Sequence, residues 1–239
     1  MLGGRFYLFT ILGFPVYADP SWVIIVALLI WRLSQLTFPW YAPGFSDGAY
    51  LAMGALGAFG LFGSVLLHEV GHMLEARRRN IPTGVITLHL FGGLAEIYAA
   101  PRKPSVEATV ALAGPAVSLL LAGVFFGAEQ AIPSGKAVAL AAVLQYLWFV
   151  NTLLLVFNLM PAFPLDGGRV LHAILWAATG KHGWSMRVAA TVGMGFGVLL
   201  IGAGVLSLAG ASFGGGLWWI LIGFFLCSAA NAARKGYPV

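Results

Sequence analysis

The chain has 239 residues, of which 60% are hydrophobic and 9% charged, and its formal net charge is +5. Ordinary soluble domains carry about 25% charged residues, so this composition excludes a soluble globular protein and indicates an integral protein of the lipid bilayer. The basic residues are few and flank apolar runs, which indicates membrane topology rather than a nucleic-acid partner. A single cysteine, Cys227, excludes an intramolecular disulfide and a metal site built from cysteines.

The apolar runs predict an all-α polytopic membrane protein with about six transmembrane helices of roughly 20 residues each. Residues 1–20 precede them and are interrupted by Gly13, Pro15 and Pro20, which favours a short hairpin or an interfacial segment over a span. We expect residues 1–239 to form a single transmembrane domain. The predicted spans cover residues 21–38, 51–76, 105–128, 137–160, 183–208 and 214–233.

Two connections carry further signals. Between the second and third spans, VITLHLF and LAEIYA flank Gly92 and Gly93, which predicts a short membrane-associated β-hairpin over residues 85–97. After the fourth span, the segment NLMPAFPLDGGR contains Pro161 and Pro164 and cannot continue as a regular helix. Non-helical backbone at membrane depth is tolerated where protein buries it or where it lines a wet cavity.

The positions of the basic residues predict the orientation of the chain. Eleven of them fall on one side of the predicted layout, and only Arg32 and Lys136 fall on the other. Basic residues accumulate on the cytoplasmic side of membrane proteins, so we expect both termini to be cytoplasmic. The predicted location is the cell (inner) membrane.

The second span contains His68, Glu69 and His72 within an otherwise apolar helix. Ionisable groups cost several kcal/mol each in hydrocarbon and are rare there without a function. Histidines four residues apart project from one face of a helix, the spacing with which H-E-x-x-H holds zinc beside a glutamate base. The alternative is a chance match, which an apolar helix makes improbable. We therefore expect a zinc site with about one ion per chain.

Catalytic zinc takes about three protein ligands and keeps a water in the remaining position. Asp166 is the best candidate for the third ligand, because it lies in the non-helical segment after Pro164. It could also, or instead, cap a helix that begins near Gly167. His89, His172 and His182 are weaker candidates, and we interpret them as interface or surface histidines.

These residues predict a hydrolytic mechanism. Zinc lowers the pKa of its bound water to about 7, so that Glu69 can accept a proton as the water attacks a carbonyl group. The oxyanion that develops needs hydrogen-bond donors. Asn158, near the end of the fourth span, is a candidate donor, and it could equally be a buried amide that ties helices together.

HEVGHMLEARR, FGG, AGPAVS and NLMPAFPLDGGR, in this order, resemble the site-2 protease family of intramembrane zinc metalloproteases. The resemblance extends over residues 61–171. It implies that His68, His72 and Asp166 bind zinc, that Glu69 is the catalytic base, and that Asn158 helps to hold the substrate or the intermediate. It also implies cleavage of peptide bonds in or near transmembrane segments of membrane-protein substrates.

Two departures from the family pattern indicate a compact form. We expect neither a PDZ-like insertion between the two motifs nor a C-terminal regulatory domain. A second function class is a membrane transporter or metal carrier that uses the same three ligands, because transporters also place ionisable residues near the bilayer midplane. A carrier has no need of Glu69 between its histidines and often has inverted repeats, which this sequence lacks.

The predicted hairpin gives a hypothesis for substrate binding. A transmembrane helix hides its peptide bonds in its own hydrogen bonds and must unwind before it can be cut. Unpaired backbone groups are costly in an apolar site, but an exposed strand can pair with them. We expect an edge of the hairpin, at Val85, Thr87 or Leu90, to pair with substrate. The alternative is a hairpin that only covers the site.

Overall fold

The computed structural model describes residues 4–89, 92–210 and 215–236. Its residues form two compact units, which are described separately below. The first comprises residues 1–100 and 113–155, and the second comprises residues 101–112 and 156–239. Two helices run through both units, α4 (Pro104–Gln130) and α5 (Val138–Asn158).

Six helices are long and apolar enough to cross a membrane, which confirms the predicted architecture of an integral membrane protein. Many of their large apolar side chains are exposed, such as Leu199 and Phe224, and these side chains would contact lipid. The six candidate spans are Pro20–Tyr41, Asp47–Arg78, Pro104–Gln130, Val138–Asn158, His182–Leu208 and Gly216–Lys235.

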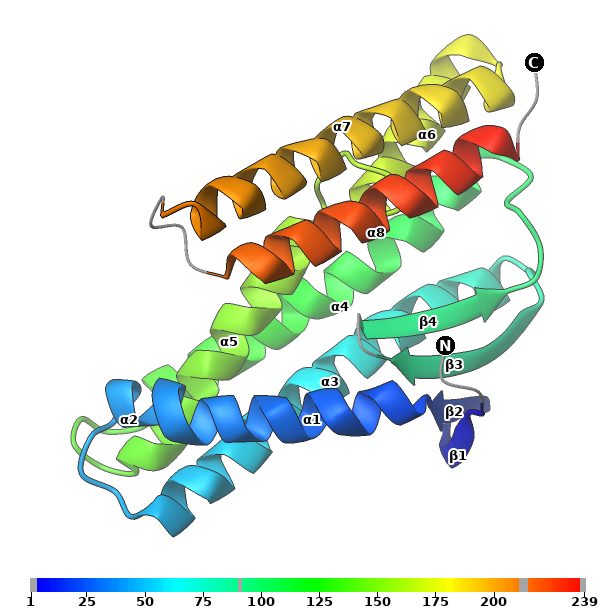
Figure 1. The fold of residues 1–239 in the computed structure, drawn as a ribbon. Coiled ribbons are helices and arrows are strands. Elements are labelled where there is room, and N and C mark those ends of the chain that lie inside the picture. The colour runs from blue at the N-terminus through cyan, green and yellow to red at the C-terminus, as the bar shows by residue number, and fades with distance from the viewer. Residues whose placement is uncertain (1–3, 90–91, 211–214, 237–239) are drawn as a thin grey trace. The chain divides into compact units, whose positions relative to one another are not determined.

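The first candidate span has three parts: α1 (Pro20–Arg32), a short π-helix (Leu33–Thr37) and α2 (Phe38–Tyr41). It packs against α3 (Asp47–Arg78), as Figure 1 shows. The side-chain oxygens of Asp19 and Ser46 accept hydrogen bonds from the first turns of α1 and α3 and so satisfy backbone donors there. Buried residues of α3 and α5 close a core around Phe38 and Tyr146.

The strands form one four-stranded sheet in the order β1-β2-β3-β4, a larger structure than the single predicted hairpin. Strands β1 (Phe6–Ile11) and β2 (Phe14–Ala18) form the short N-terminal hairpin that the sequence predicted as one of two options. Strand β2 then pairs in parallel with β3 (Thr83–His89), and β3 pairs antiparallel with β4 (Gly92–Ile97). Gly92 and Gly93 therefore belong to β4 rather than to the turn.

The sheet packs on the C-terminal half of α3 through a cluster that includes Leu66, Val70 and Met73 of the helix. Arg77 strengthens this contact, because it donates a hydrogen bond of 2.9 Å to the carbonyl oxygen of Leu12 in the β1–β2 turn. Its guanidinium also lies 4.6 Å from the centre of the Phe14 ring. The sheet is thus anchored to the same stretch of helix that carries the two histidines.

In the second unit, α7 (His182–Leu208) and α8 (Gly216–Lys235) lie side by side, as Figure 1 shows. Glycines permit their close approach: a Cβ atom added at Gly197 would lie 2.7 Å from the carbonyl oxygen of Gly223. The shorter α6 (Asp166–Thr179) packs against α7. It ends at Gly180, which has φ 68° and supplies the left-handed cap that stops the helix.

Candidate metal centre

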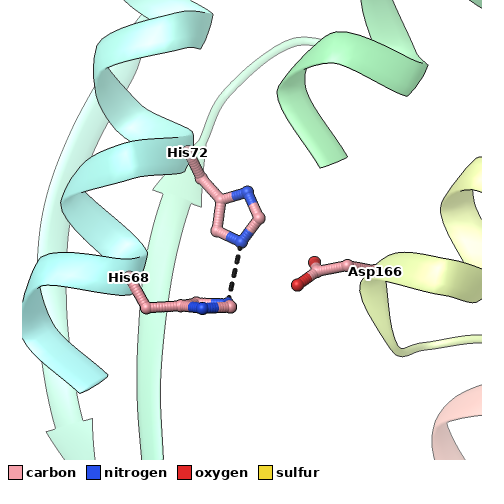
Figure 2. A group of neighbouring side chains, drawn as sticks. All are labelled: His68, His72 and Asp166. Carbon is pink, nitrogen blue, oxygen red and sulfur yellow. Dashed lines mark hydrogen bonds between the residues drawn. The ribbon is translucent and has the colours of Figure 1, made fainter. Parts of the chain in front are cut away.

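His68 and His72 meet on one face of α3, as their spacing predicts. Their Nε2 atoms are 3.1 Å apart, and Figure 2 shows this contact as a dashed line. Both side chains are buried, with 4% and 8% of their residue surface exposed. Two imidazoles that bind one tetrahedral zinc ion, with Zn–N bonds of about 2.0–2.1 Å, hold their nitrogens about 3.3 Å apart. The pair therefore fits a shared metal ion.

Gly114 of α4 leaves room in front of this pair. A Cβ atom added there would meet the Nε2 atoms of both histidines, at 2.6 Å from that of His68 and closer still to that of His72. Only glycine can occupy this position without a side chain entering the space that the two nitrogens face. The sequence interpretation did not identify this role of Gly114.

Ser118, one turn further along α4, fixes the orientation of His68. Its Oγ atom lies 2.9 Å from Nδ1 of His68, and Ser118 is fully buried. When Nδ1 donates its proton to Ser118, the lone pair of His68 lies on Nε2, the atom that faces His72. Gly71 of α3 permits this contact, since a Cβ atom there would lie 2.8 Å from the carbonyl oxygen of Ala113.

We expect Gly114→Ala to lower the zinc affinity of the His68–His72 centre several-fold and so to reduce the zinc content of the purified protein, because the added methyl group occupies the space that faces the two Nε2 atoms. Gly123→Ala is the matched control: it lies on the same helix, and its Cβ atom would meet nothing within 4 Å. Alanine stabilises a helix interior by about 1 kcal/mol relative to glycine, so neither change should unfold α4. Equal zinc content in the two variants, measured by mass spectrometry, would contradict this role of Gly114.

Glu69, between the two histidines, lies against the backbone of β4. A Cβ atom added at Gly93 would lie 2.6 Å from Cγ of Glu69. Strand β4 is an edge of the sheet, since it pairs only with β3 in the described strand order. The candidate base thus lies beside the backbone of an edge strand, within one compact unit.

The structure moves the predicted free edge from β3 to β4. Val85 and Thr87 lie on β3, and Thr87 pairs with Tyr17 of β2 on one side and with Leu94 of β4 on the other, so it is not on a free edge. Val85 lies within the register shift between Thr83 and Ile86. Leu90 lies outside the described residues. His89 ends β3 opposite Gly92, and burial lowers its pKa below the ordinary value for histidine despite the nearby charge of Asp19.

Asp166 belongs to the second unit and is the first residue of α6. Leu165 occupies the N-cap position, so the predicted alternative of Asp166 as the cap is wrong. Gly167 and Gly168 let the first turn of α6 lie against the loop that precedes it. A Cβ atom at either position would overlap backbone atoms of residues 159–163. Asn158 ends α5 in the same unit.

The sequence predicted Asp166 as a ligand beside His68 and His72, and Figure 2 labels these three side chains. The donor set of two imidazoles and one carboxylate suits zinc. Because the histidines and Asp166 belong to different units, the role of Asp166 as third ligand is part of the proposal below.

Other polar residues lie where the sequence did not place them. His172, interpreted as an interface histidine, is fully buried and bonded to Glu107 at 2.8 Å. Asn151, which the sequence interpretation passed over, donates a hydrogen bond of 3.0 Å to Ser64, one turn before His68. Glu75 pairs with Arg79 at 2.8 Å at the end of α3.

A buried H-E-x-x-H pair on a membrane-crossing helix defines a metal-binding integral membrane protein. The sequence model of Peptidase family M50 matches residues 56–134 and 127–202, more than half of the chain. The chain belongs to this family, which confirms the resemblance seen in its motifs. The solved structure of the site-2 protease from Methanocaldococcus jannaschii matches with a TM-score of 0.64 at 25% identity, over 99% of this chain and 98% of that one.

Two curated relatives support the same assignment. "Putative zinc metalloprotease sll0528" of Synechocystis is 37% identical over all of this chain and 63% of its own length. "Putative zinc metalloprotease Rip3" of Mycobacterium tuberculosis is 35% identical over 92% of this chain and 56% of its own length. The chain thus spans somewhat more than half the length of these relatives.

Proposed function

We propose that this protein is an intramembrane zinc metalloprotease that hydrolyses peptide bonds in or near transmembrane segments of membrane-protein substrates. The observation that carries the proposal is the pair of buried Nε2 atoms, 3.1 Å apart, on an apolar helix with Glu69 between the two histidines. Membership of Peptidase family M50 supports it.

His68, His72 and Asp166 would hold the metal, one ion per chain at this centre. Zinc bound there would lower the pKa of its water to about 7 and polarise the carbonyl group that is attacked. Ser118 would accept a hydrogen bond from Nδ1 of His68, which leaves the lone pair of the ring on Nε2, and the close approach of Gly114 keeps the space between the helices open.

Glu69 would act as the general base and then as the general acid. It accepts a proton from the attacking water as the C–O bond forms, and it donates that proton to the amine nitrogen as the C–N bond breaks. Asn158 would donate a hydrogen bond to the developing oxyanion or to the substrate backbone. Its place at the end of α5, in the same unit as Asp166, supports this role.

Strand β4 would hold the unwound substrate. It is the edge strand beside Glu69, and its described residues Gly92–Ile97 expose Leu94 to solvent or lipid. A substrate strand that pairs with this edge satisfies its own backbone groups and passes the base. In this proposal the edge that pairs with substrate is β4, whereas the sequence predicted an edge at Val85, Thr87 or Leu90.

Proline substitutions in β4 test the pairing. Neighbouring residues of a strand direct their N–H groups to opposite sides, so Leu94→Pro and Ala95→Pro remove one donor from the β3 side and one from the free edge. We expect the free-edge variant to keep its zinc and lose cleavage. Phe9→Pro on β1, the opposite edge, is the control and should cut normally. Normal cleavage by both β4 variants would leave the strand as a cover only.

The basic residues support an orientation with both termini in the cytoplasm and a location in the cell membrane. Arg234 and Lys235 end α8, and Arg77 and Arg78 end α3. A reporter that is active only in the cytoplasm should therefore be active when it is fused to either terminus.

Mapping of new protein termini tests the function without a known substrate. Membranes from cells that express the native protein should contain new termini within or next to transmembrane segments of other membrane proteins. These termini should be absent from cells that express Glu69→Gln at the same level. Identical termini in both samples, or none in either, would contradict the proposal.

A further inference from the structure

A second cluster of ligand-type side chains lies in the second unit, built from residues that the proposed reaction does not use. Glu107 lies in the first turn of α4, His172 near the middle of α6, and His182 is the first residue of α7. Each offers one ligand atom, and these atoms lie within 4.8 Å of one another. The cluster therefore joins α4 to the consecutive helices α6 and α7, and Glu107 and His172 are 65 residues apart in sequence.

Glu107 and His172 are both buried, with 8% and 0% of their residue surface exposed. The Nδ1 atom of His172 lies 2.8 Å from Oε1 of Glu107. A buried carboxylate is costly without a cationic or hydrogen-bonding partner, so this contact must include a positive centre or a proton. The question is whether that centre is a proton or a metal ion.

The other nitrogen of His172 favours a metal ion. Nε2 lies 3.3 Å from the backbone carbonyl oxygen of His182, an atom that can only accept a hydrogen bond. A proton on Nε2 satisfies that acceptor and leaves the lone pair of Nδ1 directed at the carboxylate of Glu107. Metal-binding histidines have this arrangement, with the distal N–H donated to a carbonyl oxygen.

His182 adds a third donor, which a simple histidine–glutamate pair does not need. Its ring meets that of His172 edge to face, with the ring centres 4.7 Å apart. Trp176 stacks on His172 and contacts the ring of His182 at 4.5 Å, so the two imidazoles are held against an apolar wall. Two imidazole nitrogens and one carboxylate oxygen form a donor set that binds zinc-like ions in preference to calcium or magnesium.

We propose that Glu107, His172 and His182 form a second metal site, which binds a divalent transition-metal ion such as zinc and ties the first turns of α4 and α7 to α6. This ion is additional to the one that His68 and His72 hold. Asp166 begins the same helix that carries His172, so the second ion would brace α6 and thereby the segment that presents Asp166. Its role is structural, and its absence should loosen α6 without removing any catalytic group.

The test is metal binding by the full-length protein, purified without a histidine tag and dialysed against zinc. The native chain should bind about two ions, and His68→Ala should retain about one, at the second site. Glu107→Gln and His182→Gln should each lose the second ion. Glutamine at 107 can still accept a hydrogen bond from His172, so this variant should remain folded. His89→Gln, a change of the one remaining histidine, should bind as the native chain does.

Cobalt separates the two sites by spectroscopy. In the His68→Ala background, cobalt should give visible absorption bands of a low-coordinate site, which Glu107→Gln abolishes and His89→Gln leaves unchanged. If His68→Ala binds no ion, or if Glu107→Gln and His182→Gln retain the second ion, the proposal is wrong and the cluster is a protonated histidine–glutamate pair. Failure of the HExxH centre has a different signature: the ion content would then be insensitive to His68→Ala and still fall in Glu107→Gln.

Discussion

Glu69→Gln is expected to reduce the rate of proteolysis by about 100-fold or more while the zinc content stays unchanged, because loss of a general acid–base group costs about 10²–10⁴-fold. Glutamine has nearly the same shape as glutamate but cannot accept the proton of the attacking water. Glu69 is not one of the three ligands of the proposed metal centre. The cleavage rate should therefore fall while the zinc content does not. The rate is measured on a substrate identified by terminus mapping, and the zinc content by mass spectrometry of the bound metal.

Glu75→Gln is the matched control for this change. It lies on the same helix, and its carboxylate pairs with Arg79 at 2.8 Å and with Arg78 at 4.0 Å. Loss of this exposed pair should cost little stability and no activity. If Glu69→Gln cleaved at the native rate, or if it lost its zinc, Glu69 would not be the base.

Asp166→Ala should deplete the HExxH centre of zinc and abolish cleavage together. Loss of an outer-shell partner of a metal ligand weakens binding by about 10–100-fold, and loss of a ligand itself should weaken it more. His72→Ala should have the same effect. The measurement is the zinc affinity of each variant by competition with a chelator of known affinity, with circular dichroism as the check on folding.

Asp47→Ala provides the control for a helix-terminal aspartate. Asp47 is the first residue of α3, as Asp166 is of α6, and it is exposed. Both changes remove a favourable charge from a helix N-terminus, which costs about 0.3–1 kcal/mol. Only the Asp166 change should affect zinc. Full zinc affinity in Asp166→Ala would exclude it as the third ligand and leave that position to another residue.

The sequence predicted the residues of the HExxH centre on α3 because their relation is local. Two histidines four residues apart share a helix face whatever the rest of the chain does, and the apolar length of the run places that face in a membrane. The same local logic predicted the number of long apolar helices and the break in the chain before Asp166. The family followed from the order of motifs along the chain.

Contacts between distant segments were beyond this reasoning. Thr87 looked like an edge residue because its own hairpin has two edges, but β2 covers one edge of β3 from about 70 residues away in sequence. His172 looked like a surface histidine because nothing beside it in sequence can bond it, whereas Glu107 lies 65 residues earlier. The role of Gly114 depends on the approach of its backbone to the two histidines, which no local pattern indicates.

Local spacing thus determined which side chains of α3 share one helix face, since helix periodicity depends only on neighbours along the chain. Tertiary structure decided what surrounds them: Ser118 on His68, the β4 backbone beside Glu69, and the buried pair of Glu107 and His172. These contacts depend on how closely helices and strands approach one another. That approach is set by the packing of whole faces, including glycines such as Gly71, and no pattern within one segment specifies it.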